Sequence, residues 1–405
     1  MGVKIKRRIS VNNILLYILI FFGLFDTARN YTYLPIAFGY LKDIVLIFLF
    51  CMNINLFKNY LSRNGTAGIL IFYSFMTLGR GFLFSTVNCV GVLTGIIKFF
   101  EIFMFMTLFF YWDKVFKISY KKVIHFYVYA GTSILIFVNI FGYFIPNPIV
   151  SRHIWNGVLA QGFYSGRITV GQPPIAVYPV IVSLIYLMVF EGSKTRIILY
   201  LIALFISTSN TGIVSVALCF IILLVLKNNK KKLFQIIAIG TGMLVLLYWV
   251  KSVHISDFLR NIISIYGDKI IKVLSGESDV GLTVRALHGR AAISELKSVF
   301  DILIGKGMYG YFSGRNPYRL VENTYISIYC SMGIIGLLLW ILYFVKNLSY
   351  NIWLYLKYQR NSNIFLALIT IVILCHMYTL DVQICYTIYF SYALFYMYFT
   401  NQQTR

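Results

Sequence analysis

The chain has 405 residues, of which 59% are hydrophobic and 18% aromatic, and its formal net charge at pH 7 is +23. A soluble core does not absorb so much apolar side chain, whereas helices surrounded by lipid do. The apolar runs are about 15–25 residues long and do not alternate in polarity, which excludes barrel strands and predicts an all-α integral membrane protein.

Twelve apolar runs are candidate transmembrane helices. A hydrocarbon core of about 30 Å needs roughly 20 helical residues, so the runs at 11–25, 195–208 and 211–226 are short for a full crossing. No small-x-small cleavage site follows the first run, so we expect an uncleaved helix there and not a signal peptide. The predicted spans are residues 11–25, 33–55, 66–86, 89–111, 122–145, 173–190, 195–208, 211–226, 232–252, 322–345, 362–379 and 382–399.

Lysine and arginine residues follow a regular order along these spans. With the N-terminus in the cytoplasm, twenty of the thirty-six fall on cytoplasmic segments, and each such segment carries at least one. The positive-inside rule therefore predicts cytoplasmic N and C termini. Most of the positive charge is then a topology signal with some attraction to anionic membrane lipids, and no nucleic-acid partner is expected.

This topology divides the chain into three parts. Residues 1–252 hold transmembrane helices 1–9 and an outer loop at 146–172. Residues 253–321 form one large, partly helical outer loop with amphipathic helices, and residues 322–405 hold helices 10–12. A membrane protein whose one substantial polar region lies on the outer side is expected to carry out its chemistry there.

Charged residues lie inside two of the predicted spans. Lys42 and Asp43 belong to the second span, and Lys98 and Glu101 to the fourth, where both lysines follow the start of the span by nine residues. At 1.5 Å per residue, both lysines lie about 13–14 Å deep. Isolated charges at that depth cost at least about 2.5–3.5 kcal/mol each, so we expect cross-pairing between the two spans. The pattern fits either a structural ion-pair network or a proton or substrate relay.

Arg80 lies between two glycines near the outer end of the third span and has no acidic neighbour in sequence. Flanking glycines let another backbone or a lipid headgroup approach closely. Two interpretations remain open, an arginine that reaches the membrane interface and an arginine that binds an anion.

The outer loop at 146–172 is cationic and contains no carboxylate. Arg152 and Arg167 supply guanidinium groups, which bind phosphate through their forked geometry, and Trp155 offers a ring on which a sugar face can stack. The loop therefore fits a phosphorylated, sugar-bearing ligand, and the alternative is a loop that faces lipid headgroups.

The long outer region, residues 251–321, contains ten lysine and arginine residues. An apolar stripe over residues 256–275 predicts an amphipathic helix that can lie on the membrane surface. A second helix is predicted over residues 283–304, with Gly305 at its end.

Three candidate site residues lie on this second predicted helix. Arg285 and His288 are i, i+3 neighbours. Arg290 is rotated by about 140° from Arg285, so one of these arginines is expected to face the site and the other solvent. Arg315 and Arg319 follow in the same loop.

Glu322 and Asn323 lie at the mouth of the tenth predicted span. A lone carboxylate among arginines fits a general base that takes a proton from a hydroxyl group. The alternative is an ion pair with a neighbouring arginine of the long loop.

The sequence carries no metal-binding constellation, because it has no Asp-x-Asp pair, no clustered histidines and no cysteine pairs at ligand spacing. No phosphate-binding glycine loop lies on the cytoplasmic side either, which disfavours nucleotide hydrolysis and nucleotide-sugar use. We therefore expect neither a metal nor another cofactor.

Two stretches carry a resemblance to a known family. Residues 303–310 read LIGKGMYG, and residues 322–336 read ENTYISIYCSMGIIG. Together they resemble the O-antigen ligase and Wzy-type polymerase superfamily, whose members have a Gly-x-Gly turn, a His-Asn-like pair and a Gly-Ile-Ile-Gly-type span. Residues 207–212 are similar to its Ser-Arg-Thr-type segment, with Asn210 in place of arginine. Glu322 stands where the ligases have histidine, which favours a polymerase.

The resemblance implies a metal-independent glycosyltransferase of the bacterial inner membrane with a periplasmic active site. It would transfer a growing glycan from undecaprenyl diphosphate to the sugar hydroxyl of an incoming lipid-linked repeat unit. A chain-length regulator and a flippase of the same pathway are the expected protein partners.

The roles implied by this reading fall into two groups. The expected catalytic residues are Glu322, Arg290, Arg285 and His288. The expected substrate-binding residues are Arg80, Arg152, Arg167, Arg315, Arg319, Asn323 and Tyr325.

Two other functions remain open. One is the ligase that moves finished glycan onto lipid A core, and the other is a flippase or other transporter of lipid-linked oligosaccharides. The charges of the second and fourth spans favour a transporter, whereas the long outer loop disfavours it.

Overall fold

The computed structural model describes residues 10–25, 40–85, 87–137, 175, 177–191, 193–206, 209–226, 280–311, 321, 323–379 and 385–403. Every regular element in these ranges is helical, and none of the described residues forms a strand. The predicted all-α class is confirmed.

Most of the described helices lie within the first 226 residues. They are α1 (Val11–Leu24), α2 (Leu41–Met52), α3 (Ile54–Arg63), α4 (Gly65–Leu78), α5 (Gly81–Phe84), α6 (Cys89–Phe110), α7 (Trp112–Val115), α8 (Tyr120–His125) and the π-helical segment η3 (Phe126–Gly131). They continue with α12 (Tyr178–Tyr186), the π-helical segment η4 (Leu187–Glu191), α13 (Lys194–Ile206) and α14 (Asn210–Leu226).

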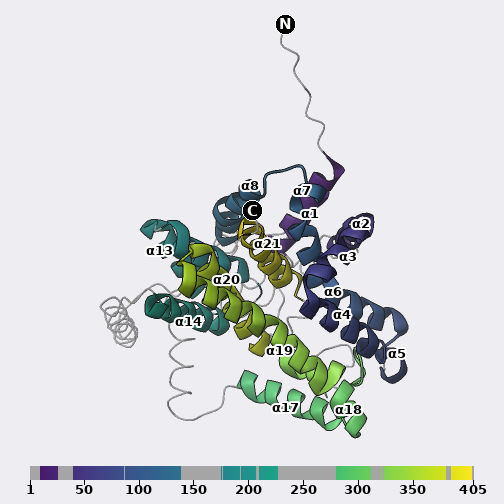
Figure 1. Ribbon diagram of the computed structural model, residues 1–405. Helices are drawn as coiled ribbons and strands as arrows, with labels where there is room; N and C mark the ends of the chain where they lie inside the picture. Colours follow the sequence, from purple (N-terminus) through teal and green to yellow (C-terminus); the bar gives the residue numbers. More distant parts are fainter. Residues whose placement is uncertain are drawn as a thin grey trace, which may run out of the picture.

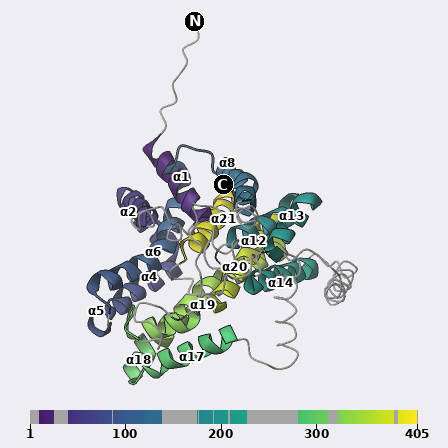
Figure 2. The same cartoon turned by 180° about the vertical axis from the view of Figure 1, so that it is seen from behind.

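The C-terminal half supplies the centre of the fold. It contains α17 (Val280–Ser294), α18 (Val299–Ile304), α19 (Thr324–Tyr358), α20 (Asn361–Thr379) and α21 (Tyr386–Gln403). In both views of the molecule, α19, α20 and α21 run between the helices α1 to α6 on one side and α12 to α14 on the other (Figures 1 and 2). The short helices α17 and α18 lie at one end of the assembly, against the beginning of α19 (Figure 1).

Four of the described helical segments are long and apolar enough to cross a membrane. They are Gly65–Phe84, Cys89–Phe110, Thr324–Tyr358 and Asn361–Thr379. A fifth crossing is reached if α2 and α3, which are bent by 79°, count as one span. A helical membrane protein is therefore supported, whereas the count of twelve spans stays a prediction, in part because residues 232–252 lie outside the described ranges.

Aromatic side chains fill the contact between α6 and α21. Phe105 packs edge-on against Tyr386 and Phe390, with ring centroids 5.1 and 5.4 Å apart, and Phe109 meets Phe390 at 5.5 Å. Such edge-to-face pairs contribute about 0.5–1.5 kcal/mol beyond the burial of their area. The high aromatic content of the chain thus serves helix packing at its centre.

The helix predicted over residues 283–304 is interrupted. Two helices, α17 and α18, occupy this region, and the side chain of Ser298 accepts a hydrogen bond of 3.0 Å from the N–H of Asp301 at the start of α18. This cap begins a new helix, so the prediction of one continuous helix is wrong. The predicted end is confirmed, since Gly305 follows Ile304 with a φ of 72°.

Candidate functional site

The two stretches that carry the family resemblance meet in space. We call residues Gly305–Gly310 the Gly305 turn, and this turn packs against α19 through backbone hydrogen bonds. The N–H of Lys306 donates to the carbonyl of Cys330 at 2.9 Å, and the N–H of Gly307 donates to that of Ser331 at 2.8 Å. Segments separated by about twenty residues in sequence therefore form one structural unit.

The turn fits into a break in α19. Gly333 leaves the helical conformation with φ 68° and ψ −173°, and a Cβ atom built on it would overlap the backbone of Leu303 and Ile304. A Cβ atom on Gly305 would likewise overlap the backbone of Ser331 and Met332. Both the left-handed φ and the close approach require glycine at these two positions.

The opposite side of the turn contacts the end of α4 and the start of α5. The N–H of Met308 donates to the carbonyl of Leu78 at 3.1 Å. Gly307, with φ 85°, approaches the backbone of Arg80 and Gly81 so closely that a Cβ atom would overlap it. The turn is therefore held between α19 and the α4–α5 segment.

Tyr73 of α4 closes this junction. Its hydroxyl donates to the carbonyl of Met332 at 3.0 Å and, more weakly, to that of Leu303 at 3.4 Å. One side chain of α4 thus contacts the backbone of both α19 and α18.

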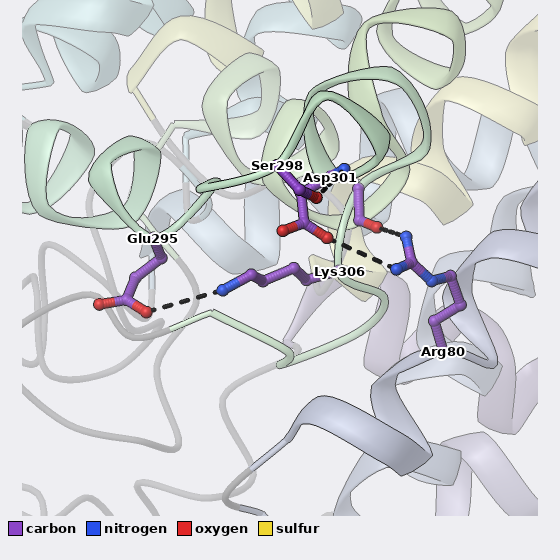
Figure 3. Close-up of polar contacts among 6 residues, drawn as sticks. Arg80, Glu295, Ser298, Asp301 and Lys306 are labelled. Atoms are coloured by element: carbon purple, nitrogen blue, oxygen red, sulfur yellow. Dashed lines mark hydrogen bonds and ion pairs between the residues drawn. The ribbon is translucent and has the colours of Figure 1, made fainter.

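Arg80 fixes α18 to the same junction. Its guanidinium donates to the carbonyl of Gly305 and lies 3.5 Å from the carboxylate Oδ1 of Asp301 (Figure 3). The rings of Phe84 and Phe300 flank it, with centroids 5.0 and 4.6 Å from Cζ. These contacts account for the low exposure of the Arg80 side chain, 16%. Asp301 follows Arg80 by 221 residues, so sequence proximity gave no sign of this partner.

A second ion pair connects the Gly305 turn to the segment between α17 and α18. Lys306 Nζ lies 3.8 Å from Glu295 Oε2, with side-chain exposures of 15% and 39% (Figure 3). The Lys306 side chain therefore connects the turn to the residue that follows α17.

Asn323 and Tyr325 tie the beginning of α19 to α20. The Asn323 side chain caps α19 by accepting from the N–H of Ile326 at 3.1 Å, and it donates to the carbonyl of Tyr378 at 2.9 Å. The Tyr325 hydroxyl donates to the carbonyl of Leu374 at 3.0 Å. Both side chains thus have structural partners, and their contact with substrate stays a prediction.

The predicted site residues on α17 differ in solvent exposure. The buried face of α17 contains Gly289 and Ala292, and a Cβ atom on Gly289 would lie 2.8 Å from Cδ1 of Ile326 in α19. Arg290 is exposed and His288 is half-buried. Arg290 is therefore free to meet a ligand beyond the α17–α19 contact. Arg285 lies in α17, and its side chain is outside the description.

Several predicted site residues lie outside the described ranges. They are Arg152, Arg167, Arg315, Arg319 and Glu322. Of the predicted site residues, the structure describes Arg80 beside the Gly305 turn, His288 and Arg290 on α17, and Asn323 and Tyr325 at the start of α19.

The charged residues of the second and fourth predicted spans do pair across helices. Lys98 Nζ of α6 lies 3.3 Å from Asp43 Oδ2 of α2 and 3.8 Å from Glu101 Oε1. Lys42 Nζ lies 4.7 Å from the centroid of the Tyr386 ring in α21. The predicted cross-pairing is confirmed, and this charge cluster connects three helices.

The members of the cluster are deeply buried. Lys42 is 6% exposed, Asp43 8%, Lys98 7% and Glu101 0%. In an apolar interior each charge needs a partner of opposite sign, because desolvation alone costs several kcal/mol per ion. Nowhere in the described part of the chain do three or more His, Cys, Asp or Glu side chains gather to hold a metal ion.

No protein-family model and no curated protein sequence matches the chain. The long apolar helices define the class as an α-helical membrane protein.

The glycines of the junction give a direct stability test. Gly333→Ala and Gly307→Ala are expected to lower the free energy of unfolding by at least about 1–2 kcal/mol each, which is the cost of a left-handed L-residue before any overlap is added. The measurement is thermal unfolding in detergent, followed by tryptophan fluorescence. Gly65→Ala is the matched control, because a Cβ atom there meets nothing within 4 Å. Equal midpoints for all three variants would contradict the described packing.

The charge cluster gives a second test. Lys98→Met removes the ammonium group that pairs with both Asp43 and Glu101, so we expect a loss of about 3–5 kcal/mol in unfolding free energy. The double variant Lys98→Met/Asp43→Asn should recover part of this loss. Lys58→Met, at an exposed position of α3, should change little. A Lys98→Met protein with unchanged stability would contradict a structural role for the cluster.

Proposed function

We propose that the protein is a polymerase of lipid-linked oligosaccharide repeat units, such as those of O-antigen or a similar surface polysaccharide. The donor is a glycan chain on undecaprenyl diphosphate, and the acceptor is the sugar hydroxyl of an incoming lipid-linked repeat. The setting is the inner membrane of a bacterium, with twelve spans, cytoplasmic termini and the site on the periplasmic face.

One observation carries this proposal. The Gly305 turn and the Cys330–Gly333 segment, which belong to the two stretches similar to the polymerase superfamily, are hydrogen-bonded to each other. Asn323, the neighbour of Glu322, caps the same helix. Residues that form one site must lie close together in space. A chance similarity in two separate segments would not require those segments to be in contact.

The reaction that we propose needs two chemical functions. Glu322 takes the proton of the acceptor hydroxyl, whose oxygen attacks the anomeric carbon of the donor sugar. The bond from that carbon to the diphosphate oxygen breaks, and undecaprenyl diphosphate leaves with the electron pair. The sugar–diphosphate bond supplies the energy, so no nucleotide is consumed.

Arginines stabilise the charge that develops on the leaving diphosphate. In this proposal Arg290, which is exposed on α17, takes this role, and Arg285, Arg167 and Arg80 are further candidates. Fixed cationic donors act most strongly where water is excluded, and losing one such donor typically costs about 10²–10³ in rate. His288, half-buried on the same helix as Arg290, is the second candidate base.

The remaining candidates bind the glycan or its phosphate groups in this proposal. Arg152, Arg315 and Arg319 belong to the outer loops, and Asn323 and Tyr325 to the beginning of α19. A chain-length regulator and a flippase of the same pathway would act beside the polymerase.

Two substitutions test the assigned roles. Glu322→Gln removes the base, which typically costs about 10²–10⁴ in rate, and Arg290→Ala removes a diphosphate ligand. Both variants should reach the membrane at normal levels and leave single, unpolymerised repeats on the surface glycan, as read from its electrophoretic ladder.

Matched controls are available for both variants. Lys297→Ala removes an exposed cation just after α17, and Asp113→Asn removes an exposed carboxylate on α7. Both controls should retain long chains. Long chains from Glu322→Gln and Arg290→Ala would reject the assigned roles, and complete loss of surface glycan, single repeats included, would indicate the ligase instead.

A transporter of lipid-linked oligosaccharides is the second candidate function. The buried charge cluster of α2 and α6 favours it, because charges along a transmembrane path are typical of transporters. A deletion strain separates the two. Lipid-linked repeats that accumulate facing the periplasm support the polymerase, and repeats that accumulate facing the cytoplasm support the transporter.

A further inference from the structure

The Gly305 turn contacts two membrane-length helices well inside their ends. The N–H of Met308 donates a hydrogen bond to the carbonyl of Leu78. Leu78 precedes the end of the segment Gly65–Phe84 by six residues. The side chain of Met308 packs against Gly95, where a Cβ atom would lie 2.8 Å from Met308 Cγ, and Gly95 follows the start of α6 by six residues. At 1.5 Å per residue, both contacts are about 9 Å inside the helix ends.

These two helices set the depth of the membrane. Gly65–Phe84 has 20 residues and α6 has 22, which gives lengths of about 30–33 Å, close to the thickness of the hydrocarbon core. Their ends therefore lie near the two boundaries of that core. Two independent helices then place Met308 about 9 Å below the boundary.

Non-helical backbone at this depth must satisfy its polar groups within the protein. The Gly305 turn meets this condition. Four consecutive N–H groups, those of residues 305–308, donate to the carbonyls of Asp301, Cys330, Ser331 and Leu78. Gly305, Gly307, Met308 and Gly310 are all buried.

The charged side chains of this region are also arranged for an apolar surrounding. Arg80 and Asp301 form an ion pair with side-chain exposures of only 16% and 13%. Lys306 extends to Glu295, which is 39% exposed and lies just after α17. The Lys306 side chain thus runs from a buried backbone toward a more exposed partner. Lysine side chains reach the membrane–water interface from within a bilayer in the same way.

The surface of α18 is apolar where it is exposed. Val299 is 74% exposed, Phe300 59% and Leu303 41%. This surface adjoins α5 through the ring of Phe300, which lies on the guanidinium of Arg80, and Leu83 of α5 is 80% exposed. Because α5 ends a candidate membrane span, the exposed face of α18 continues a lipid-facing surface.

We infer that residues 298–311 form a re-entrant element, in which α18 enters the bilayer, its exposed face contacts lipid acyl chains, and the Gly305 turn lies beneath the membrane surface. Residues 298–311 would then lie within the bilayer and not in an outward loop over residues 253–321. It concerns membrane depth alone and holds whether or not the protein is a polymerase.

Nitroxide labels test the inference. Single cysteines at Val299, Leu303, Leu83 and Ser294 are introduced in the full chain after Cys51→Ser and Cys89→Ser remove the exposed native thiols. The labelled proteins are placed in vesicles of phosphatidylcholine and phosphatidylglycerol. Electron paramagnetic resonance then compares collisions with oxygen, which partitions into lipid, and with a water-soluble nickel chelate.

Leu83 on α5 is the lipid reference, and exposed Ser294 at the end of α17 is the aqueous one. The ratio of oxygen to nickel collisions at Val299 and Leu303 should match that at Leu83 and exceed that at Ser294 several-fold. A ratio equal to that of Ser294 overturns the inference, because α18 would then face water. Low collision rates with both reagents also overturn it, because protein, such as a second copy, would then cover α18.

Discussion

Close backbone packing at the Gly305 turn is the constraint on which the rest of this region depends. The turn fits between α19 and the α4–α5 segment only because Gly305, Gly307 and Gly333 combine left-handed φ angles with approaches that exclude a Cβ atom. Its N–H groups donate to carbonyls of both neighbours, so every backbone N–H of residues 305–308 has a hydrogen-bond acceptor. The turn also reaches the residue that follows α17, through the Lys306–Glu295 ion pair.

Charged side chains inside the apolar molecule likewise have partners of opposite charge. Lys98 lies between Asp43 and Glu101, and Arg80 is shared between Asp301 and a backbone carbonyl. Each arrangement connects helices that are far apart in sequence, so each ion pair also holds helices together. In the proposed polymerase, Arg80 would hold α18 and the Gly305 turn, while Arg290 on α17 is exposed.

The helices and the buried charge pairs could be predicted from sequence because both follow from the cost of polar groups in lipid. Apolar runs located α6 and α20 closely, and the expense of isolated charges implied that Lys98 would find Asp43. The contacts of Arg80 could not be predicted, since its partner Asp301 is distant in the chain. Nor could the break at Gly333, which sits inside an apolar run. The proposed base, Glu322, lies outside the described residues.

Hydrogen–deuterium exchange of the peptide 303–311 tests the central junction most directly. Although this peptide contains a non-helical turn, the N–H groups of Lys306, Gly307 and Met308 are bonded to carbonyls of α19 and α4. We expect these amides to exchange as slowly as those of α19 in the reconstituted protein, and to exchange faster in Gly333→Ala. Exchange within seconds in the unmodified protein, at the rate of an exposed loop, would contradict the account.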